Sequence, residues 1–340
     1  MHILVTGGAG YIGSHVVKLL LENSDHDITI LDNLVTGFQK TIDTLMAIAK
    51  ENGANLNFIQ EDLSDFKKIE SIMHENRFDA IIHFAASLVV PESVVNPLKY
   101  YLNNTANTAN LLKCATQNGV KKFIFSSTAA VYGEPQFNTQ HSTFTINESS
   151  ETHPINPYGM SKLMSERVLK DTAFAIDDFK YAALRYFNVA GSDPDGRIGQ
   201  STENATLLIK VAAEAATGKR EKMYIFGDDY PTHDGTGIRD YIHVVDLAQA
   251  HIEALAYLEA HQSDVFNVGY SRGFSVKEVI DTMKKVSGVD FTVETKERRA
   301  GDPAILISDN TKIKNAMHWK PRYDDLEVIC QTTLAWEKKI

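Results

Sequence analysis

Short apolar runs, many of them β-branched, alternate with longer helical patterns through the first 190 residues of the chain. Each run is apolar on both faces, which is typical of strands buried inside a parallel sheet. Right-handed helical crossovers between such strands produce a doubly wound α/β sheet. The predicted strands are His2–Thr6, Asp27–Leu31, Leu56–Gln60, Ala80–Ala85, Lys122–Ser127 and Tyr181–Phe187, and the predicted helices are Tyr11–Glu22, Phe66–Glu75, Leu98–Asn118 and Tyr158–Lys170.

The pattern changes after Asn188. Loops rich in Gly, Pro and Asp (residues 191–203 and 227–240) flank a helix predicted near Asn204–Thr217. A further helix is predicted at Asp246–Ala260, with Asp246 as N-cap and Gln249 completing a capping box. Val265–Gly269 is predicted to add a strand to the main sheet, and two or three helices with little strand follow from Ser275.

The 340-residue chain is long enough for the sheet and an appended lobe. We therefore predict an α/β fold with a smaller, discontinuous C-terminal substrate-binding lobe. Residues 1–189 and 241–269 are assigned to the sheet domain, and residues 190–240 and 270–340 to the lobe.

Charge and cysteine content narrow the class of function. The net charge is −10, from 34 basic and 44 acidic residues, and no run of five basic residues occurs. Binding of nucleic acid or an anionic membrane through bulk charge is therefore disfavoured. Cys114 and Cys330 form neither a disulfide framework nor a zinc motif, so no metal is predicted. The strand pattern begins at His2, leaving no room for a signal peptide, and no stretch approaches 18 apolar residues, so we expect a cytoplasmic protein.

A glycine-rich turn follows the first predicted strand. Gly7, Gly10 and Gly13 lie where a dinucleotide-binding (Rossmann) fingerprint belongs, because glycines let the backbone approach a pyrophosphate at a helix N-terminus. Asp32 ends the second strand, where a carboxylate accepts hydrogen bonds from an adenosine ribose. Asn33 and Leu34 follow it rather than Arg or Lys, which favours NAD over NADP.

Tyr158 and Lys162 lie four residues apart at the start of a predicted helix, with Asn156 as N-cap and Pro157 at the first position. This spacing places both side chains on one helix face. A neighbouring ammonium and a positively charged nicotinamide ring would favour the phenolate, which could take a proton from a substrate hydroxyl. Thr128, at the end of a parallel strand, could bond the same substrate oxygen.

These motifs resemble the UDP-glucose 4-epimerase family of the extended short-chain dehydrogenase/reductase superfamily. The glycine turn and the Tyr-Lys pair indicate only the superfamily. The segment GDDYPTHDGTGIRDYIHVVDLA is far more specific, and the similarity extends from residue 1 to about residue 320.

The resemblance implies roles for three groups of residues. Thr128, Tyr158 and Lys162 are the implied catalytic residues. The implied NAD-binding residues are Gly7, Gly10, Tyr11, Ile12, Gly13, Asp32, Asn33, Asp62, Leu63, Phe84, Ala85, Asn103, Tyr158, Lys162 and Tyr186. The implied UDP-sugar-binding residues are Thr128, Tyr158, Asn188, Asn204, Phe226, Arg239, Arg299, Asp302 and Leu306.

Three positions depart from the family pattern. Thr128 stands where serine is usual and keeps the hydroxyl. Leu88 stands where some members have a lysine that contacts the cofactor. Leu306, or Ile305 if the count is shifted by one, stands where some members have a tyrosine that closes the sugar pocket. A smaller side chain there leaves room beside the C2 substituent, so we predict some tolerance of UDP-N-acetylglucosamine.

The implied reaction interconverts UDP-galactose and UDP-glucose through a transient 4-keto sugar with NAD held between turnovers. A homodimer is also implied, formed through Leu98–Asn118 and the helix of Tyr158, although core packing explains their apolar stripes equally well. One alternative is a nucleotide-sugar dehydratase or decarboxylase of the same superfamily, against which the acid-free pair Ala129-Ala130 argues. The other is a non-catalytic NAD-sensing module, against which the intact Tyr158 and Lys162 argue.

Overall fold

A seven-stranded, wholly parallel sheet forms the centre of the molecule in the computed structural model, which describes residues 1–134, 145–203, 205–299 and 302–340. The strand order is β11-β7-β5-β4-β1-β2-β3, and every pair along it is parallel. The strands are β1 (His2–Thr6), β2 (Asp27–Asp32), β3 (Leu56–Gln60), β4 (Ala80–His83), β5 (Lys122–Ser126), β7 (Lys180–Tyr186) and β11 (Asp264–Val268). The predicted doubly wound α/β fold is confirmed.

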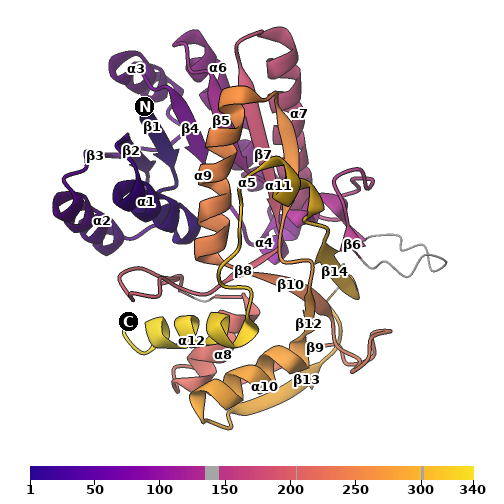
Figure 1. Ribbon diagram of the computed structural model, residues 1–340. Coiled ribbons are helices and arrows are strands. Elements are labelled where there is room, and N and C mark those ends of the chain that lie inside the picture. The colour runs from indigo at the N-terminus through magenta and orange to yellow at the C-terminus, as the bar shows by residue number, and fades with distance from the viewer. Residues whose placement is uncertain (135–144, 204, 300–301) are drawn as a thin grey trace.

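Helices cover both faces of this sheet (Figure 1). On one face α1 (Tyr11–Asn23) packs against α2 (Gln39–Asn52) and α9 (Val244–Ala260), and on the other α6 (Asn107–Gln117) packs against α3 (Phe66–Asn76) and α7 (Pro157–Ala175). The central residues of β1 are apolar because both faces of the strand are buried. Ile3 and Val5 lie in one core and Leu4 in the other, and all three are fully buried.

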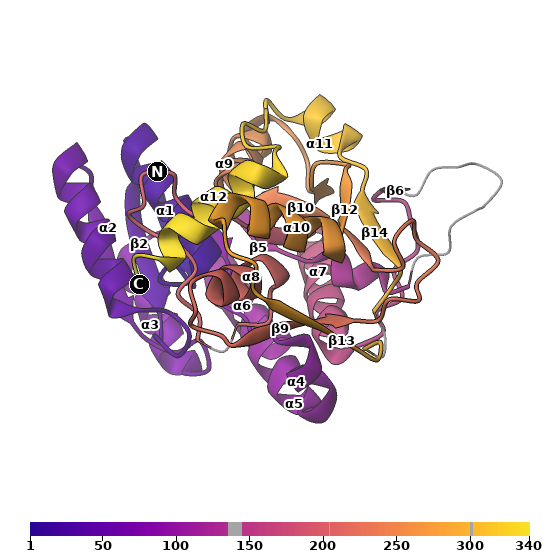
Figure 2. The ribbon, with the colours of Figure 1, turned by 90° about the horizontal axis from the view of Figure 1, so that it is seen from below.

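A smaller set of strands and helices gathers at one end of the main sheet. Its helices α8 (Leu208–Ala216), α10 (Val276–Ser287) and α12 (Leu326–Glu337) pack against one another, as Figure 2 shows from below. One sheet has the order β12-β10-β14-β6, with β8 also paired to β10, and a second pairs β13 with β9. These strands are β6 (Thr145–Ile146), β8 (Asn188–Ala190), β9 (Lys222–Phe226), β10 (Ile238–His243), β12 (Gly273–Ser275), β13 (Thr292–Lys296) and β14 (Ile305–Ser308).

One expectation for this region, the Asp246 N-cap with its capping box, is wrong. Helix α9 begins at Val244, and its N-cap is His243, whose Nδ1 accepts the Val245 N–H at 3.2 Å. Asp246 lies inside the first turn and instead accepts the N–H groups of Arg322 and Tyr323 at 2.9 and 2.8 Å, which ties the chain after α11 (Thr311–Ala316) to α9. As predicted, the segment after Ser275 contains three helices (α10, α11 and α12) and little strand, namely the short β13 and β14.

The predicted helix Leu98–Asn118 is present as a continuous helical segment whose middle part is π-helical. After α4 (Val90–Val95) come α5 (Pro97–Tyr100), a π-helical stretch (Tyr101–Ala106) and then α6. Helix α2 was not predicted at all, since its pattern is short and mixed with charged residues. Within the described ranges, no helix is long and apolar enough to cross a membrane.

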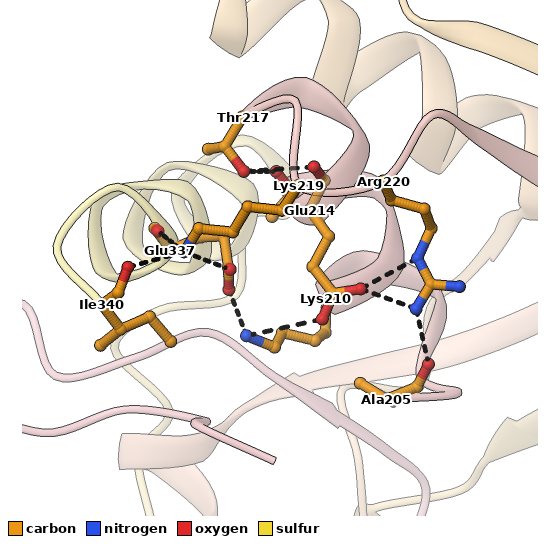
Figure 3. Close-up of polar contacts among 9 residues, drawn as sticks. Ala205, Lys210, Glu214, Thr217, Lys219, Arg220, Glu337 and Ile340 are labelled. Carbon is orange, nitrogen blue, oxygen red and sulfur yellow. Dashed lines mark hydrogen bonds and ion pairs between the residues drawn. The ribbon is translucent and has the colours of Figure 1, made fainter. Parts of the chain in front are cut away.

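Buried ion pairs fasten the last helix to α8 (Figure 3). The Lys210 ammonium pairs with the Glu337 carboxylate, and both residues are nearly inaccessible, at 4% and 2% exposed. Lys219 reaches the same carboxylate at 2.9 Å, and Arg220 pairs with Glu214 at 2.8 Å. This cluster joins the C-terminal end of α12 to α8 and to the turn that follows α8.

Candidate active site

The glycine turn between β1 and α1 has the geometry that its sequence predicts. Gly7 has a φ of +72°, and a Cβ there would lie 2.7 Å from the Ala85 nitrogen at the end of β4. A Cβ on Gly13 would collide with the Gly7 carbonyl. Only glycine fits both positions, and the turn exposes backbone N–H groups at the start of α1, where an anion binds favourably.

Asp32 ends β2 beside this turn. Its carboxylate accepts the N–H groups of Ala9 and Leu34 at 3.0 and 2.8 Å, so the two loops orient it. Burial raises the pKa of Asp32, while those two hydrogen bonds lower it. Nearby, Asn33 donates to Asp62 at 2.6 Å, and the hydrogen bonds of Asp62, chiefly to Ser64, lower its pKa.

The remaining predicted cofactor residues surround the carboxyl ends of β1, β4 and β7. The Tyr11 hydroxyl donates to the Gly191 carbonyl at 2.5 Å and so joins the glycine turn to the loop after β8. Asn103 donates to Ser87 at 3.0 Å. Ile12 and Phe84 are half-buried and pack on the core of one face of the sheet. Leu63 is buried in the core of the other face, and half-buried Ala85 packs on the same core. The Tyr186 hydroxyl is hydrogen-bonded to the Ser126 hydroxyl at 2.7 Å.

Tyr158, Lys162 and Thr128 come together at the carboxyl end of β5. The Lys162 ammonium donates to the Ser126 carbonyl at 2.8 Å, and the Thr128 hydroxyl is hydrogen-bonded to Tyr158. All three residues are buried, at 8% exposed or less. The structure therefore brings the predicted catalytic residues into one cluster.

Burial controls the charge of this pair. It raises the pKa of Tyr158, which the Thr128 hydrogen bond lowers only in part. It also lowers the pKa of Lys162 to about 7, against the opposing charge of Glu166. Burial therefore favours the neutral form of both groups in the protein alone. The predicted lowering of the Tyr158 pKa also depends on the positive charge of the nicotinamide, so it stays a prediction. A phenolate here requires a further positive charge.

Local sequence explains how Tyr158 is placed. Asn156 caps α7 by accepting the Gly159 N–H at 2.8 Å, with Pro157 at the first helical position, as predicted. Gly159 lets the helix approach the strand end, since a Cβ there would lie 2.5 Å from the Ala130 carbonyl oxygen. Thr128 caps the 3₁₀ turn Ala129–Tyr132 that carries this carbonyl.

The π-helical stretch holds further polar residues that sequence reasoning missed. Asn104 is buried, donates to Ser161 on α7 at 3.0 Å, and accepts the Ser87 N–H at 2.7 Å. Together these contacts fix the loop after β4 against the catalytic helix. Irregular helical turns of this kind are frequent at functional sites. The run NNTANTAN inside an apolar helix was the available signal.

Aromatic and guanidinium groups lie together in the lobe. Arg299 stacks on the Phe226 ring, with its guanidinium carbon 3.7 Å from the ring centroid, and both line an open cavity of ≈ 640 Å³ at the ends of β9 and β13. Arg239 is half-buried on β10 and forms an ion pair with Asp302. It also donates to the Ile238 carbonyl at 2.8 Å. Arg239 is therefore held in place by protein groups, whereas Arg299 is exposed.

The other predicted sugar residues lie on neighbouring strands. Asn188 is on β8, paired with Tyr241 of β10. Leu306 pairs with Arg239 in register and packs on the cluster that contains Ala129, the residue after Thr128. Because side chains alternate along a strand, Ile305 faces the other way, so the geometry favours Leu306 as the residue nearer the catalytic cluster. Asn204 lies outside the described residues, and Leu88 is exposed.

A parallel dinucleotide-binding sheet, a glycine turn and a buried Tyr-Lys-Thr cluster at its carboxyl edge define the short-chain dehydrogenase/reductase class. A family model described as GDP-mannose 4,6 dehydratase matches residues 4–332. A UDP-glucose 4-epimerase of Lacticaseibacillus casei is 44% identical over 99% of this chain and 97% of that protein. The chain belongs to the UDP-glucose 4-epimerase family, as the sequence predicted.

Two solved structures extend the comparison. The UDP-Glc/GlcNAc 4-epimerase of Campylobacter jejuni is 56% identical, with a TM-score of 0.86 over 100% of this chain and 99% of that one. The UDP-glucose 4-epimerase of Bifidobacterium longum, in complex with NAD⁺ and UDP, is 35% identical, with a TM-score of 0.92 over 100% of this chain and 98% of that one.

Proposed function

We propose that this protein is an isomerase that interconverts UDP-galactose and UDP-glucose at C4 of the sugar, using a tightly held NAD. The single observation that supports this most directly is the buried cluster of Tyr158, Lys162 and Thr128 at the edge of a dinucleotide-binding sheet. Residues 1–189 and 241–269 would hold NAD, and residues 190–240 and 270–340 would hold the UDP-sugar.

The turn and strand ends fit NAD. The positions of Gly7 and Gly13 admit no Cβ, so a pyrophosphate can lie against the backbone at the start of α1. Asp32 keeps free lone pairs for the two ribose hydroxyls while its orientation is fixed by two N–H groups. A 2′-phosphate would meet this carboxylate and be repelled.

The chain's own residues move one proton and hold the sugar oxygen. When bound, NAD⁺ supplies a positive charge that favours the Tyr158 phenolate and a two-electron acceptor for the hydrogen on C4. Tyr158 takes the proton of the 4-hydroxyl and later returns it to the same oxygen. Thr128 bonds that oxygen, and Lys162, braced on the Ser126 carbonyl, stabilises the phenolate.

The 4-keto sugar must turn over between the two half-reactions, so binding energy should reside in the UDP group. Arg299 and Arg239 offer guanidinium groups for the diphosphate, and Phe226 offers a ring for uracil. Loose contacts around the hexose then permit rotation. Weak binding of the hexose in the ground state does not by itself lower kcat, because only interactions that strengthen in the transition state accelerate the reaction.

Activity on N-acetylated UDP-hexosamines is a second part of the proposal. Leu306, rather than a tyrosine, lies on the face that leads to the catalytic cluster, which leaves room beside C2 of the sugar. The Campylobacter jejuni relative, described as a UDP-Glc/GlcNAc 4-epimerase, supports this breadth.

A cytoplasmic homodimer completes the proposal. Leu98 and Leu102 are 70% and 64% exposed beside α7, whose Phe174 is 92% exposed, and these apolar surfaces suit a helix–helix interface. Both thiols, Cys114 and Cys330, are free and buried, which fits a reducing compartment. Sedimentation equilibrium should show a dimer that Leu98→Glu dissociates, while the matched change Val35→Glu, 79% exposed on another face, leaves it intact.

One assay tests the reaction. The purified protein is incubated with UDP-galactose or UDP-N-acetylgalactosamine, without added cofactor, and the C4 epimers are measured. We expect both products, with UDP-glucose formed by endogenous NAD. A dehydratase would release a 4-keto-6-deoxy sugar instead, and a non-catalytic sensor would turn over neither substrate although it retains NAD.

A further inference from the structure

A third buried titratable residue continues the row formed by Tyr158 and Lys162. Glu166 lies four residues after Lys162 on α7, so the three side chains share one helix face at successive turns. Glu166 is 5% exposed. A carboxylate buried to this extent must be paired and hydrogen-bonded to be tolerated.

The Glu166 carboxylate has partners on two other elements. The Ser127 hydroxyl donates to it at 2.5 Å, and Arg185 on β7 donates through Nε at 3.0 Å and Nη2 at 2.6 Å. Arg185 continues to the Tyr132 hydroxyl at 3.0 Å. Such a two-pronged guanidinium–carboxylate contact fixes orientation as well as distance.

These contacts join the elements that carry the predicted catalytic groups. Ser127 lies between Ser126, whose carbonyl holds Lys162, and Thr128, which bonds Tyr158. Arg185 directly precedes Tyr186, whose hydroxyl bonds Ser126. A displacement of Glu166 would therefore shift the end of β5, the end of β7 and helix α7 relative to one another.

Glu166 also sets the charge environment of Lys162. Lys162 lies 4.9 Å from the centre of the Phe125 ring and near His83, whose pKa burial lowers to about 3, so that histidine carries no charge at neutral pH. Tyr158 faces it as a neutral phenol in the protein alone, and Arg185 is neutralised by its own pairing. Burial lowers the Lys162 pKa to about 7, and Glu166 is the group whose charge raises it.

We propose that Glu166 is a positioning residue for the reaction: through Ser127 and Arg185 it fixes the strand end against the catalytic helix, and its negative charge keeps Lys162 cationic. This inference rests on the proposed epimerase function. A merely structural ion pair would contribute to folding alone and would not influence the titration of Lys162.

The test compares wild type with Glu166→Gln, which keeps the shape and removes the charge. We expect kcat to fall by about tenfold or more with KM nearly unchanged, and the alkaline limb of the kcat–pH profile to move about one pH unit lower. Removal of a carboxylate lowers the lysine pKa, so Lys162 loses its proton at lower pH. Glu166→Asp keeps the charge and should restore the wild-type limb even where kcat stays reduced.

Matched variants separate the effect of the Glu166 hydrogen bonds on position from the effect of its charge on Lys162. Ser127→Ala keeps the carboxylate and should lower kcat without moving the limb. Glu337→Gln makes the same chemical change in the buried Lys210 pair that joins α12 to α8, and it should lower stability while the profile stays in place. If Glu166→Gln does not fold, the double variant Glu166→Gln/Arg185→Gln removes both buried charges and should shift the limb in the same direction by a smaller amount, because the opposing guanidinium charge is lost as well.

A second readout does not depend on turnover. The ¹³Cε signal of Lys162, assigned by its loss in Lys162→Met, should titrate about one unit lower in Glu166→Gln than in wild type. An unchanged midpoint in the charge-removed variants, or an equal shift in Glu166→Asp, would overturn the proposal. Absence of wild-type turnover with the expected NMR shift would instead sink the epimerase assignment and leave the Glu166–Lys162 coupling standing.

Discussion

The two ends of the proposed site are built in opposite ways. At the carboxyl edge of the main sheet, Tyr158 and Lys162 are buried, and burial drives both toward their neutral forms. In the lobe, Arg299 is exposed and stays charged, stacked on the Phe226 ring. Charge is scarce where the proton moves and plentiful where a diphosphate would bind.

This difference matches the two tasks of a 4-epimerase. Preorganised groups in a low-dielectric site act strongly on a developing charge, whereas charged groups near solvent bind substrate and transition state alike. The buried end should therefore control kcat, and the exposed end should control KM. Substitutions at each end can break or sharpen that separation.

The largest effect is expected from Tyr158→Phe. Loss of the phenolic oxygen removes the group that takes and returns the proton, so kcat should fall by about 10³-fold. KM and the NAD content released on denaturation should stay close to wild type, because the ring and the hydrogen bond from Lys162 to Ser126 remain. Undiminished turnover in a folded, NAD-loaded sample would contradict the mechanism, and Tyr257→Phe on α9 is the matched control.

A smaller effect of the opposite kind is expected from Arg299→Ala. A charge-assisted hydrogen bond to phosphate contributes about 2 kcal/mol, so KM should rise about 30-fold while kcat changes by less than about threefold. Arg272→Ala is the matched control, since Arg272 also stacks on a phenylalanine, Phe274, but outside this cavity. A fall in kcat with unchanged KM would show that the exposed end takes part in the chemical step.

The sequence predicts the buried end better than the exposed one. Strands, glycine turn and helix cap follow from local rules, and Asn156 and Pro157 take the predicted N-cap and first helical positions. The lobe is assembled from short strands whose partners are distant in sequence, so β9 and β13 left no periodic signal. Counting along the sequence left Leu306 and Ile305 as alternatives. The register of β10 and β14 shows that Leu306 lies on the same face as Arg239.

The charge states of the buried titratable side chains could not be predicted from the sequence. The i, i+4 spacing of Tyr158 and Lys162 places an ammonium near the phenol, but spacing contains no information on burial, which raises the pKa of Tyr158 in the protein alone. The same limit applies to Glu166, which reads as an ordinary helix-surface glutamate until Arg185 is seen beside it. Long-range packing decides whether such a residue is solvated or buried.

A more modest effect is expected from Leu306→Tyr. The larger ring would occupy the space beside C2 of the sugar, so the ratio of kcat/KM for UDP-N-acetylgalactosamine to that for UDP-galactose should fall about tenfold. Ile305→Tyr places the same ring on the opposite face of β14 and should leave the ratio nearly unchanged. Equal ratios in wild type and Leu306→Tyr would remove Leu306 from the specificity argument.

The smallest effect concerns the burial that extends beneath the chemical end. His83 lies fully buried under it, bonded to the Thr6 and Thr108 hydroxyls at 2.6 and 2.8 Å, and burial lowers its pKa from 6.5 to about 3. The unfolded chain therefore takes up a proton below pH 6.5 that the folded protein refuses until near pH 3, so stability falls as the pH drops through this window. At pH 5.5 the loss is about 1 kcal/mol for this histidine.

Urea unfolding at pH 7.5 and pH 5.5 measures this loss, and the decrease in the free energy of unfolding should be about 1 kcal/mol smaller in His83→Gln than in wild type. The comparison uses the difference between the free energies of unfolding of one variant at the two pH values. A packing defect lowers both values equally, so it cancels. His243, at the end of β10 where α9 begins, also has a pKa lowered to about 3 by burial, and His243→Gln should flatten the dependence by a similar amount. A flattening by His243→Gln alone would place the acid sensitivity at the end of β10 and leave the region beneath Tyr158 and Lys162 insensitive to pH.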